Sequence, residues 1–334
     1  MTAGEGSATA SLASGEVAAK GDAMDVLCVG QLAADILVRP VERVDFGVDT
    51  KRVDGIDIKS GGDGLNVALG LAKLGSRVGF CGKVGSDQLG EYLAGVIRRA
   101  GIDDRGLRRT DEAATCSCLV LINSKGDRSF FYHGGANELF SPHDVDESMV
   151  AVASIVHLGG TYLLPRLDGE GAARLFERAR AAGKLTSMDV TWDVTGRWLS
   201  VIEPCLPHLS FFMPSIREAE QIAGSREPQA IAAFFEDRGV GTTVIKLGEK
   251  GCYVKPRGEP GIAVGAFRTR VVDTTGAGDS FVAGFLTGVL RQWDPRRSAS
   301  FACAVAAMNI RQVGATGGIP TFEEALRFME RGGE

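Results

Sequence analysis

The sequence predicts an α/β fold in which helices cover both faces of a mainly parallel sheet, with a small second β-sheet beside it. Two observations predict this fold. Short apolar runs alternate with helix-like segments along most of the chain, as in parallel sheets that are buried on both faces. Two stretches, 36–60 and 115–133, break that rhythm, because they show strand-like alternation and turn signals with no helix between. We expect them to form a small sheet that stands off the main one as a lid.

The first 23 residues are rich in Ala, Gly and Ser and lack the basic start and apolar stretch of a signal peptide. We therefore expect a flexible tail over 1–23 and one folded domain over 24–334. Strands are predicted at 25–30 and 77–85, and helices at 64–75 and 89–101. Each of the two helices ends at a glycine, as helices commonly do.

The second half of the chain continues the alternation. Strands are predicted at 154–160, 185–190, 210–215 and 242–248, and helices at 169–183 and 217–224, with a long helical region after residue 279. In the lid, the residues SKGD at 124–127 have the composition of a hairpin turn.

Composition excludes several classes of partner. The net charge of −5 and the pI near 5.6 leave no basic field for nucleic acid or an anionic membrane, and no apolar run reaches the length of a membrane span. The seven cysteines are scattered, mostly within apolar runs, and form no CxxC pair. We interpret them as buried free thiols of a cytoplasmic protein.

The first of two glycine-rich segments that carry chemistry is DTTGAGD at 273–279. Small residues before a helix let the backbone approach a ligand, and the helix N-terminus favours negative charge. Phosphoryl transfer needs such charge stabilisation and a group that accepts the hydroxyl proton. Asp279 is placed to be that acceptor, although an aspartate here is equally typical of a helix N-cap.

The second segment is SGGDGLN at 60–66, where Asp63 and Asn66 offer side chains suited to hydroxyl groups. Turn and helix-cap chemistry is the alternative interpretation for both. Asp35 follows the first strand, past the sheet edge at which α/β folds bind ligands. No GxxxxGK[ST] motif occurs, and no GxGxxG follows the first strand, which argues against a P-loop NTPase and a dinucleotide dehydrogenase.

Together these segments resemble the ribokinase/PfkB carbohydrate kinase family, over about residues 25 to 330. The N-terminal signature of that family is matched by Gly61, Gly62, Gly64, Asn66, Ala68, Gly75 and Gly85. The C-terminal signature is matched by Asp273, Thr274, Gly276, Ala277, Gly278, Asp279, Ala283 and Gly284. Between them, Lys246 to Gly248 with Gly251 is similar to the nucleotide loop of the family, and Pro214 to Glu218 to its Asn-x-x-Glu motif.

The resemblance implies a ribokinase-like fold with a β lid and transfer of the γ-phosphoryl group of ATP to a substrate hydroxyl. It implies Asp279 as the general base and the N–H groups of Gly276, Ala277, Gly278 and Asp279 as the anion hole. It assigns Asp35, Gly62, Asp63 and Asn66 to the substrate, and Ser215, Glu218, Lys246, Gly248, Glu249 and Gly251 to the nucleotide.

Cofactors and assembly are implied in the same way. Glu218 would organise the water around Mg²⁺, and Asp273 with the Thr275 carbonyl matches the position of a monovalent cation, so K⁺ activation is also an expectation. The β lid of the family often serves as a dimer interface, which implies a homodimer here.

Two positions depart from the pattern of the family. Ser215 stands where the family usually has Asn, which shortens one polar contact near the phosphates. Asp63 stands where ribokinases often carry Lys, and its negative charge would repel a phosphorylated substrate. The sequence thus favours an unphosphorylated sugar or sugar-like substrate.

Two alternatives stay open. A nucleoside kinase on the same scaffold would stack its base on lid aromatics such as Phe130, Phe131 and Tyr132, although ordinary strand packing also explains these residues. A non-catalytic binding protein that has kept the fold is the second alternative, because fold does not guarantee activity. The sequence does not name the sugar or nucleoside.

Overall fold

The computed structural model describes residues 23–333. The predicted flexible tail over 1–23 falls almost wholly outside the described residues. Within them, no helix is both long and apolar enough to cross a membrane. All seven cysteines are buried and free, as the sequence predicts.

The larger sheet has the order β13-β12-β11-β10-β9-β8-β1-β4-β5 among the described residues. Its strands are β1 (Met24–Gly30), β4 (Val78–Gly85), β5 (Asp103–Thr110), β8 (Ala153–Thr161), β9 (Leu185–Val190), β10 (Phe211–Phe212), β11 (Thr242–Lys246), β12 (Cys252–Pro256) and β13 (Ile262–Val264). The strands run parallel except for β12, which pairs antiparallel with both β11 and β13. The prediction of a mainly parallel sheet is confirmed.

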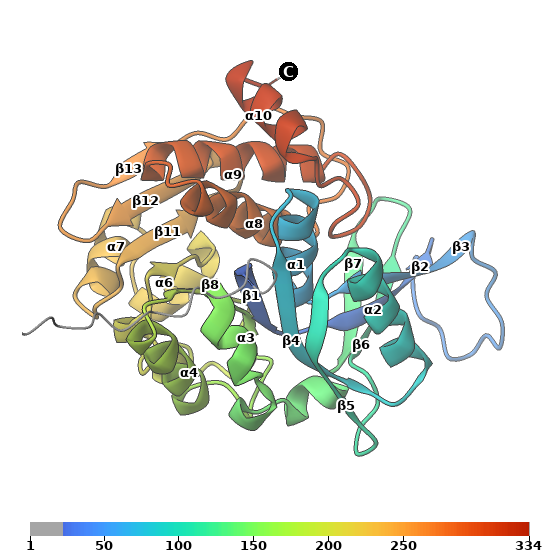
Figure 1. Ribbon diagram of the computed structural model, residues 1–334. Coiled ribbons are helices and arrows are strands. Elements are labelled where there is room, and N and C mark those ends of the chain that lie inside the picture. Colours follow the sequence, from blue (N-terminus) through green and yellow to red (C-terminus); the bar gives the residue numbers. More distant parts are fainter. Residues whose placement is uncertain (1–22, 334) are drawn as a thin grey trace, which may run out of the picture.

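Helices cover both faces of this sheet (Figure 1). One face packs against α1 (Asp63–Lys73), α2 (Gln88–Arg99), α8 (Ala277–Leu290) and α9 (Pro295–Asn309), with α10 (Phe322–Glu330) lying on α9. The other face packs against α3 (Glu147–Val152), α4 (Glu170–Ala181), α5 (Leu199–Ile202), α6 (Ile216–Ala223) and α7 (Pro228–Glu236). Within residues 23–333, 3₁₀ turns are interspersed at Gly135–Leu139, Pro142–Asp144, Leu206–His208 and Gly248–Lys250.

The burial of strand β1 on both faces explains why its sequence is mostly apolar. Side chains alternate between the faces of a strand, and Leu27 and Val29 enter one hydrophobic core while Val26 and Cys28 enter the other. All four are fully buried, so each face of the strand needs apolar side chains. The two cores fix the sheet between its helix layers.

The smaller sheet is formed by the two stretches predicted to make a lid, a name we keep for it, and it stands at one edge of the molecule beside α2 (Figure 1). Its strands have the order β3-β2-β6-β7 and are β2 (Ala33–Arg39), β3 (Gly55–Gly61), β6 (Ser117–Ile122) and β7 (Arg128–His133). Strand β2 begins at residue 33, three residues before the predicted start. The predicted hairpin turn joins β6 to β7, and Gly126 there adopts a left-handed conformation with φ 88°.

The register gives the lid two different faces. Ile36, Ile58, Leu119 and Phe131 lie opposite one another across the four strands and form what we call the outer face. Asp35, Cys118 and Tyr132 are aligned in the same way on the other side, the inner face. The inner face also holds the small core of the lid, formed by Leu37, Cys118 and Val120.

Candidate active site

A cavity of about 600 Å³ lies where the carboxyl ends of β9 and β11 meet the N-termini of α1, α6 and α8. This is the edge at which open α/β sheets bind ligands. Ten residues assigned from the sequence line it: Asp63, Ser215, Glu218, Lys246, Gly248, Glu249, Gly276, Ala277, Gly278 and Asp279. Two segments more than 200 residues apart in sequence therefore meet at one site, as the hydrogen bond between Asn66 and Asp279 illustrates.

Asp279 is not the N-cap of its helix. Helix α8 begins at Ala277, and its N-cap is Gly276 in a left-handed conformation with φ 69°. A side chain at Gly276 would place its Cβ 2.1 Å from the Ala315 carbonyl oxygen, so glycine is required there. Asp279 is the third helical residue, 8% exposed, and its Oδ2 accepts a hydrogen bond of 2.8 Å from Asn66 Nδ2. Its carboxylate therefore does not cap the helix, and it lines the cavity.

The pKa of Asp279 is raised to about 7. Burial is the largest cause and the negative charge of Asp189 adds to it, while the Asn66 hydrogen bond and the Lys246 charge work in the opposite direction. A carboxyl group with a pKa near neutrality is well matched to accept a proton from a hydroxyl group at that pH.

Asn66 lies in the first turns of α1, 4% exposed. Neither it nor Asp63 caps the helix, because the N-cap is Gly62 and makes no side-chain bond. The Asn66 amide nitrogen donates to Asp279, whereas its Oδ1 is buried with no hydrogen-bond partner among the described residues. A buried unpaired acceptor is costly, so it indicates a place where a ligand donates a hydrogen bond.

Lys246, at the end of β11, is held by Asp189 near the end of β9. Its Nζ donates to both carboxylate oxygens of Asp189, at 2.8 and 2.7 Å. Burial opposes the charge of Lys246, but Asp189 and Glu218 outweigh burial and raise its pKa. Sequence reasoning did not assign Asp189, although its place near the carboxyl end of a predicted strand was a usable signal.

Glu218 and Ser215 form the capping box that begins α6. The Ser215 N–H donates to a Glu218 carboxylate oxygen at 2.7 Å, and the Glu218 N–H donates to the Ser215 hydroxyl at 3.4 Å. The pKa of Glu218 is raised, first by burial. Ser215 therefore has a local structural role in addition to its place on the cavity wall.

The cavity holds more negative than positive charge. Five carboxylates line it, those of Asp63, Asp189, Glu218, Glu249 and Asp279, against two cations, Arg217 and Lys246. The pKa of Asp63 is raised well above its usual range by burial and by Asp279. Among the described residues, no three Asp, Glu, His or Cys side chains are grouped so as to hold a metal by themselves. Such a wall fits a hydrated Mg²⁺ that is held partly by phosphates.

Asp35 lies in a strand of the lid, and Gly62 directly follows another. Asp35 follows the first strand, as the sequence indicated, and lies inside β2 on the inner face, where burial raises its pKa to about 6. Neighbouring Gly61 is packed against it, since a Cβ there would lie 2.2 Å from Asp35 Oδ2. Gly62, with φ 90°, is similarly pressed against the backbone of Leu32.

Gln31 links the lid to α1, and sequence reasoning missed it. Its Oε1 accepts from the Asp63 N–H at 3.3 Å, and its Nε2 donates to the Tyr132 hydroxyl at 3.4 Å. Only the fold brings these three residues together, so no local pattern marks Gln31.

Asp273 and Thr275 lie in the loop before α8, and a lid residue meets them there. The Arg128 guanidinium donates to Asp273 Oδ1 at 2.8 Å and also to the Thr275 hydroxyl. Asp273 Oδ1 further accepts from the Thr275 N–H at 2.9 Å, and Oδ2 from the Gly314 N–H at 2.9 Å. With a guanidinium on this carboxylate, the residues as they stand do not fit a K⁺ ion.

A second cavity, of about 580 Å³, adjoins the first along Lys246, Gly248, Glu249 and Gly278. Gly251, assigned to the nucleotide, lies on its wall. The remaining lining is mostly apolar and includes Phe267, Phe281, Ala307 and Ile310. One cavity is thus charged and the adjoining one apolar, a pairing suited to a ligand with phosphates at one end and a flat ring at the other.

Comparisons with known proteins agree with this geometry. A family model described as pfkB family carbohydrate kinase matches residues 23–322. A 2-dehydro-3-deoxygluconokinase of Bacillus subtilis (strain 168) is 30% identical over 275 residues, which cover 79% of this chain and 84% of that protein. A fructokinase-2 of Solanum habrochaites is 29% identical over 301 residues, covering 86% and 92%. The structure of the Arabidopsis thaliana ribokinase complexed with ribose and ATP has a TM-score of 0.80 at 25% identity, covering 92% and 99%.

Proposed function

Since this chain belongs to the pfkB family of carbohydrate kinases, we propose that it transfers the γ-phosphoryl group of ATP to a hydroxyl group of an unphosphorylated sugar or sugar-like molecule. One observation carries the proposal. The buried Asp279 carboxylate lies beside the unpaired Asn66 Oδ1, at the N-terminus of α8. A substrate hydroxyl group that donates a hydrogen bond to the Asp279 carboxylate or to Asn66 Oδ1 is therefore held next to the base that removes its proton.

In the proposed reaction, Asp279 accepts the proton of the substrate hydroxyl. The oxygen then forms a bond to the γ-phosphorus as the bond from that phosphorus to the β–γ bridging oxygen breaks, and ADP leaves. The N–H of Ala277 already donates to the Thr274 carbonyl at 3.2 Å. The N–H groups of Gly276, Gly278 and Asp279 make no backbone hydrogen bond within the described part of the chain, so these three are the donors for the transferred group.

ATP is assigned to the two adjoining cavities. The apolar one would take the base, and the charged one the phosphates, close to Lys246 and Gly248. Glu218 is the carboxylate assigned to the water shell of Mg²⁺, which would offset the excess negative charge and draw the phosphates in. The bound ATP of the Arabidopsis thaliana ribokinase supports the choice of nucleotide.

The charge of the cavity favours a neutral acceptor. A second phosphate group near Asp63 and Asp279 would meet two carboxyl groups that already repel one another. The test is the rate of ADP release with a sugar against that with its monophosphate, under identical conditions. A preference for the monophosphate would exclude this part of the proposal.

A nucleoside acceptor is the second candidate, and one observation favours it. Phe130 and Tyr132 lie on the inner face of the lid and are 59% and 43% exposed, so they are not covered by ordinary strand packing. Exposed aromatic rings beside a hydroxyl-binding site are a stacking platform for a base. Phe131 points to the outer face and does not contribute.

The experiment is a measurement of ADP release from ATP and Mg²⁺ with a panel of acceptors: fructose, ribose, 2-dehydro-3-deoxygluconate, adenosine, inosine and the sugar monophosphates. The reaction without an acceptor gives the background hydrolysis. We expect turnover well above background with a sugar. Turnover with a nucleoside alone would favour the second candidate, and background rates throughout would favour a non-catalytic binding protein.

A further inference from the structure

The loop that leads into α8 carries a carboxylate whose hydrogen bonds come from two distant parts of the chain. Asp273 accepts from the Thr275 N–H and hydroxyl, at 2.9 and 2.7 Å, and from the Gly314 N–H. Its side chain is 13% exposed. In so sheltered a place, a carboxylate needs a positive partner to be stable in its ionised form.

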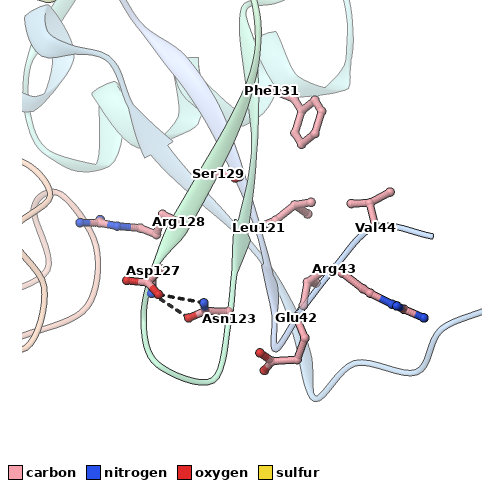
Figure 2. A pocket seen from close by; sticks show the side chains of 10 residues that line it. Glu42, Arg43, Val44, Leu121, Asn123, Asp127, Arg128, Ser129 and Phe131 are labelled. Carbon is pink, nitrogen blue, oxygen red and sulfur yellow. Dashed lines mark hydrogen bonds between the residues drawn. The ribbon is translucent and has the colours of Figure 1, made fainter. Parts of the chain in front are cut away.

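That partner is a residue of the lid. Arg128 is 145 residues away in sequence and is the first residue of β7, on the inner face. Its guanidinium pairs with Asp273 at 2.8 Å while its side chain is 25% exposed. Figure 2 shows the Arg128 side chain directed to the opposite side of the hairpin from Arg43 and Val44, with the turn held by Asn123 and Asp127.

The guanidinium contacts three consecutive residues of the loop. Besides Asp273, it donates to the Thr275 hydroxyl, and its second terminal nitrogen lies 3.5 Å from the Thr274 hydroxyl. The loop continues directly into Gly276, Gly278 and Asp279, whose N–H groups are assigned to the transferred phosphoryl group. A fixed positive charge therefore lies beside the loop that shapes the anion hole, and arginine keeps that charge at every ordinary pH.

We propose that Arg128 is the built-in cation of this loop, taking the place of a bound monovalent metal ion and tying the anion hole to the lid. The proposal rests on the proposed function for its effect on rate. Arg128 is a positioning residue, because it acts through residues 273–275 and not on the substrate. A K⁺ ion at Asp273 would have to displace the guanidinium, since two positive charges on one carboxylate oxygen repel each other.

Two consequences distinguish this role from a plain structural ion pair. The parent protein is expected to turn over at the same rate in K⁺ and in tetramethylammonium at constant ionic strength. The variant Arg128→Ala leaves Asp273 sheltered and unpaired, so it loses about tenfold or more of its rate in tetramethylammonium. In Arg128→Ala, K⁺ binds where the guanidinium was and restores most of the lost rate. A purely structural role for Arg128 would not predict this recovery.

The experiment compares the parent, Arg128→Ala and Arg43→Ala in the two salts. Arg43 is the matched control, because it is also an arginine of the lid but pairs with Asp45 at the surface. The second readout needs no substrate. The thermal midpoint of Arg128→Ala should rise by about 2 °C or more when K⁺ replaces tetramethylammonium, while those of the parent and Arg43→Ala stay unchanged.

Several results would overturn the inference. If the parent protein requires K⁺ for turnover, the inference is contradicted without any variant. This comparison of the parent in the two salts therefore decides the matter even if Arg128→Ala does not fold. An Arg128→Ala variant whose rate and thermal midpoint ignore K⁺ contradicts it equally. If no acceptor supports turnover in the parent, the proposed function fails, whereas the thermal midpoints still decide whether Arg128 stands in for the ion.

Discussion

At the scale of single residues, the site is governed by carboxyl groups that are sheltered from water and close to one another. Burial is the first cause of the raised pKa of Asp63, Glu218 and Asp279, and the negative charge of Asp189 adds to it in all three. The cations on the wall of this cavity, among the described residues, are Arg217 and Lys246, and Asp189 already holds Lys246. The site therefore gains most from a ligand that brings Mg²⁺ with its phosphates.

The raised pKa of Asp279 predicts the pH profile. Because only the ionised carboxylate accepts a proton, kcat/KM should fall about tenfold per pH unit below the pKa of about 7. In Asn66→Ala, which lacks the hydrogen bond that lowers this pKa, the acid limb should move to higher pH. The measurement is kcat/KM of both proteins between about pH 5 and about pH 9, the range over which we expect the fold to be stable. A kcat/KM that stays constant down to pH 5, as an aspartate with the ordinary pKa of 3.8 would give, would contradict the assignment.

The same shift affects stability in a defined direction. The folded protein holds the proton of Asp279 more tightly than the unfolded chain, so this group makes the fold less stable as pH rises from 3.8 to about 7. The instability is the cost of keeping a buried base ready for its substrate.

Lys246→Met tests the buried ion pair. The substitution leaves Asp189 unpaired beside three other carboxyl groups, and we expect the free energy of unfolding to fall by about 3 to 5 kcal/mol. Urea denaturation measures it. Arg178→Met is the control, because Arg178 pairs with Glu147 at the surface and should lose less than about 1 kcal/mol. Equal losses would show that the Lys246 pair is not a buried one in solution.

Single residues differed in how far the sequence could predict them. Asp279 and Asn66 stand in continuous glycine-rich motifs, so their place in one site was predictable. Gln31 and Arg128 were missed, because each acts through a partner that only the fold brings near. Asp189 was not assigned a role, although its place near the end of a predicted strand was a usable signal. The Arg128 contact to Asp273 crosses from the lid to the main domain, and nothing in the local sequence of either marks it.

At the scale of elements, the helices that begin at the site do so in different ways. Helix α8 has a glycine N-cap, which leaves the carboxylate of Asp279 free. Helix α6 begins with the Ser215–Glu218 capping box, which fixes the position of Glu218 on the cavity wall. The departure at Ser215 from the pattern of the family thus preserves the helix start.

Two substitutions separate the structural role of Ser215 from binding. Ser215→Ala should lower the free energy of unfolding by about 1 kcal/mol, whereas Ser215→Asn should not, because Asn caps as well as Ser. If the longer side chain restores a contact near the phosphates, Ser215→Asn also lowers KM for ATP. Thermal unfolding and ATP titration measure the two effects. A loss of stability in Ser215→Asn equal to that in Ser215→Ala would contradict the capping role.

Elements at the edges were the least predictable. Strand β5 has the polar sequence DDRGLRRT and lies at one edge of the main sheet, and β12 and β13 lie at the other. Edge strands are buried on fewer sides and carry a weak apolar pattern. The long helical region after residue 279 is three helices, and α9 starts at a clear signal, the Asp294 N-cap followed by Pro295.

At the scale of the whole molecule, the fold is the ribokinase-like α/β fold that the family resemblance implied. The order of its core elements could be predicted because the buried strands and amphipathic helices have strong periodicities. The contacts between the lid and the rest of the fold could not, since they depend on the register of four strands and on single side chains such as Arg128. The cytoplasmic location and the homodimer stay predictions.

The outer face of the lid provides the test of the homodimer. Ile58, Leu119 and Phe131 are exposed there in one row, an unusual surface for a lone chain. We expect Leu119→Asp to convert a dimer to a monomer, and Val194→Asp, at an exposed apolar residue elsewhere, to leave it unchanged. Sedimentation velocity measures the mass. A parent that is already monomeric would contradict the prediction.

The most direct test of the account is ADP release by Asp279→Asn with the acceptor that the parent uses. Asparagine keeps the size of the side chain and an oxygen that accepts from Asn66, but it takes up no proton at neutral pH. The account predicts a fall in turnover of about a thousandfold with a thermal midpoint that is not lowered, and an unchanged rate for the surface control Asp111→Asn. An Asp279→Asn variant that turns over as fast as the parent would contradict it.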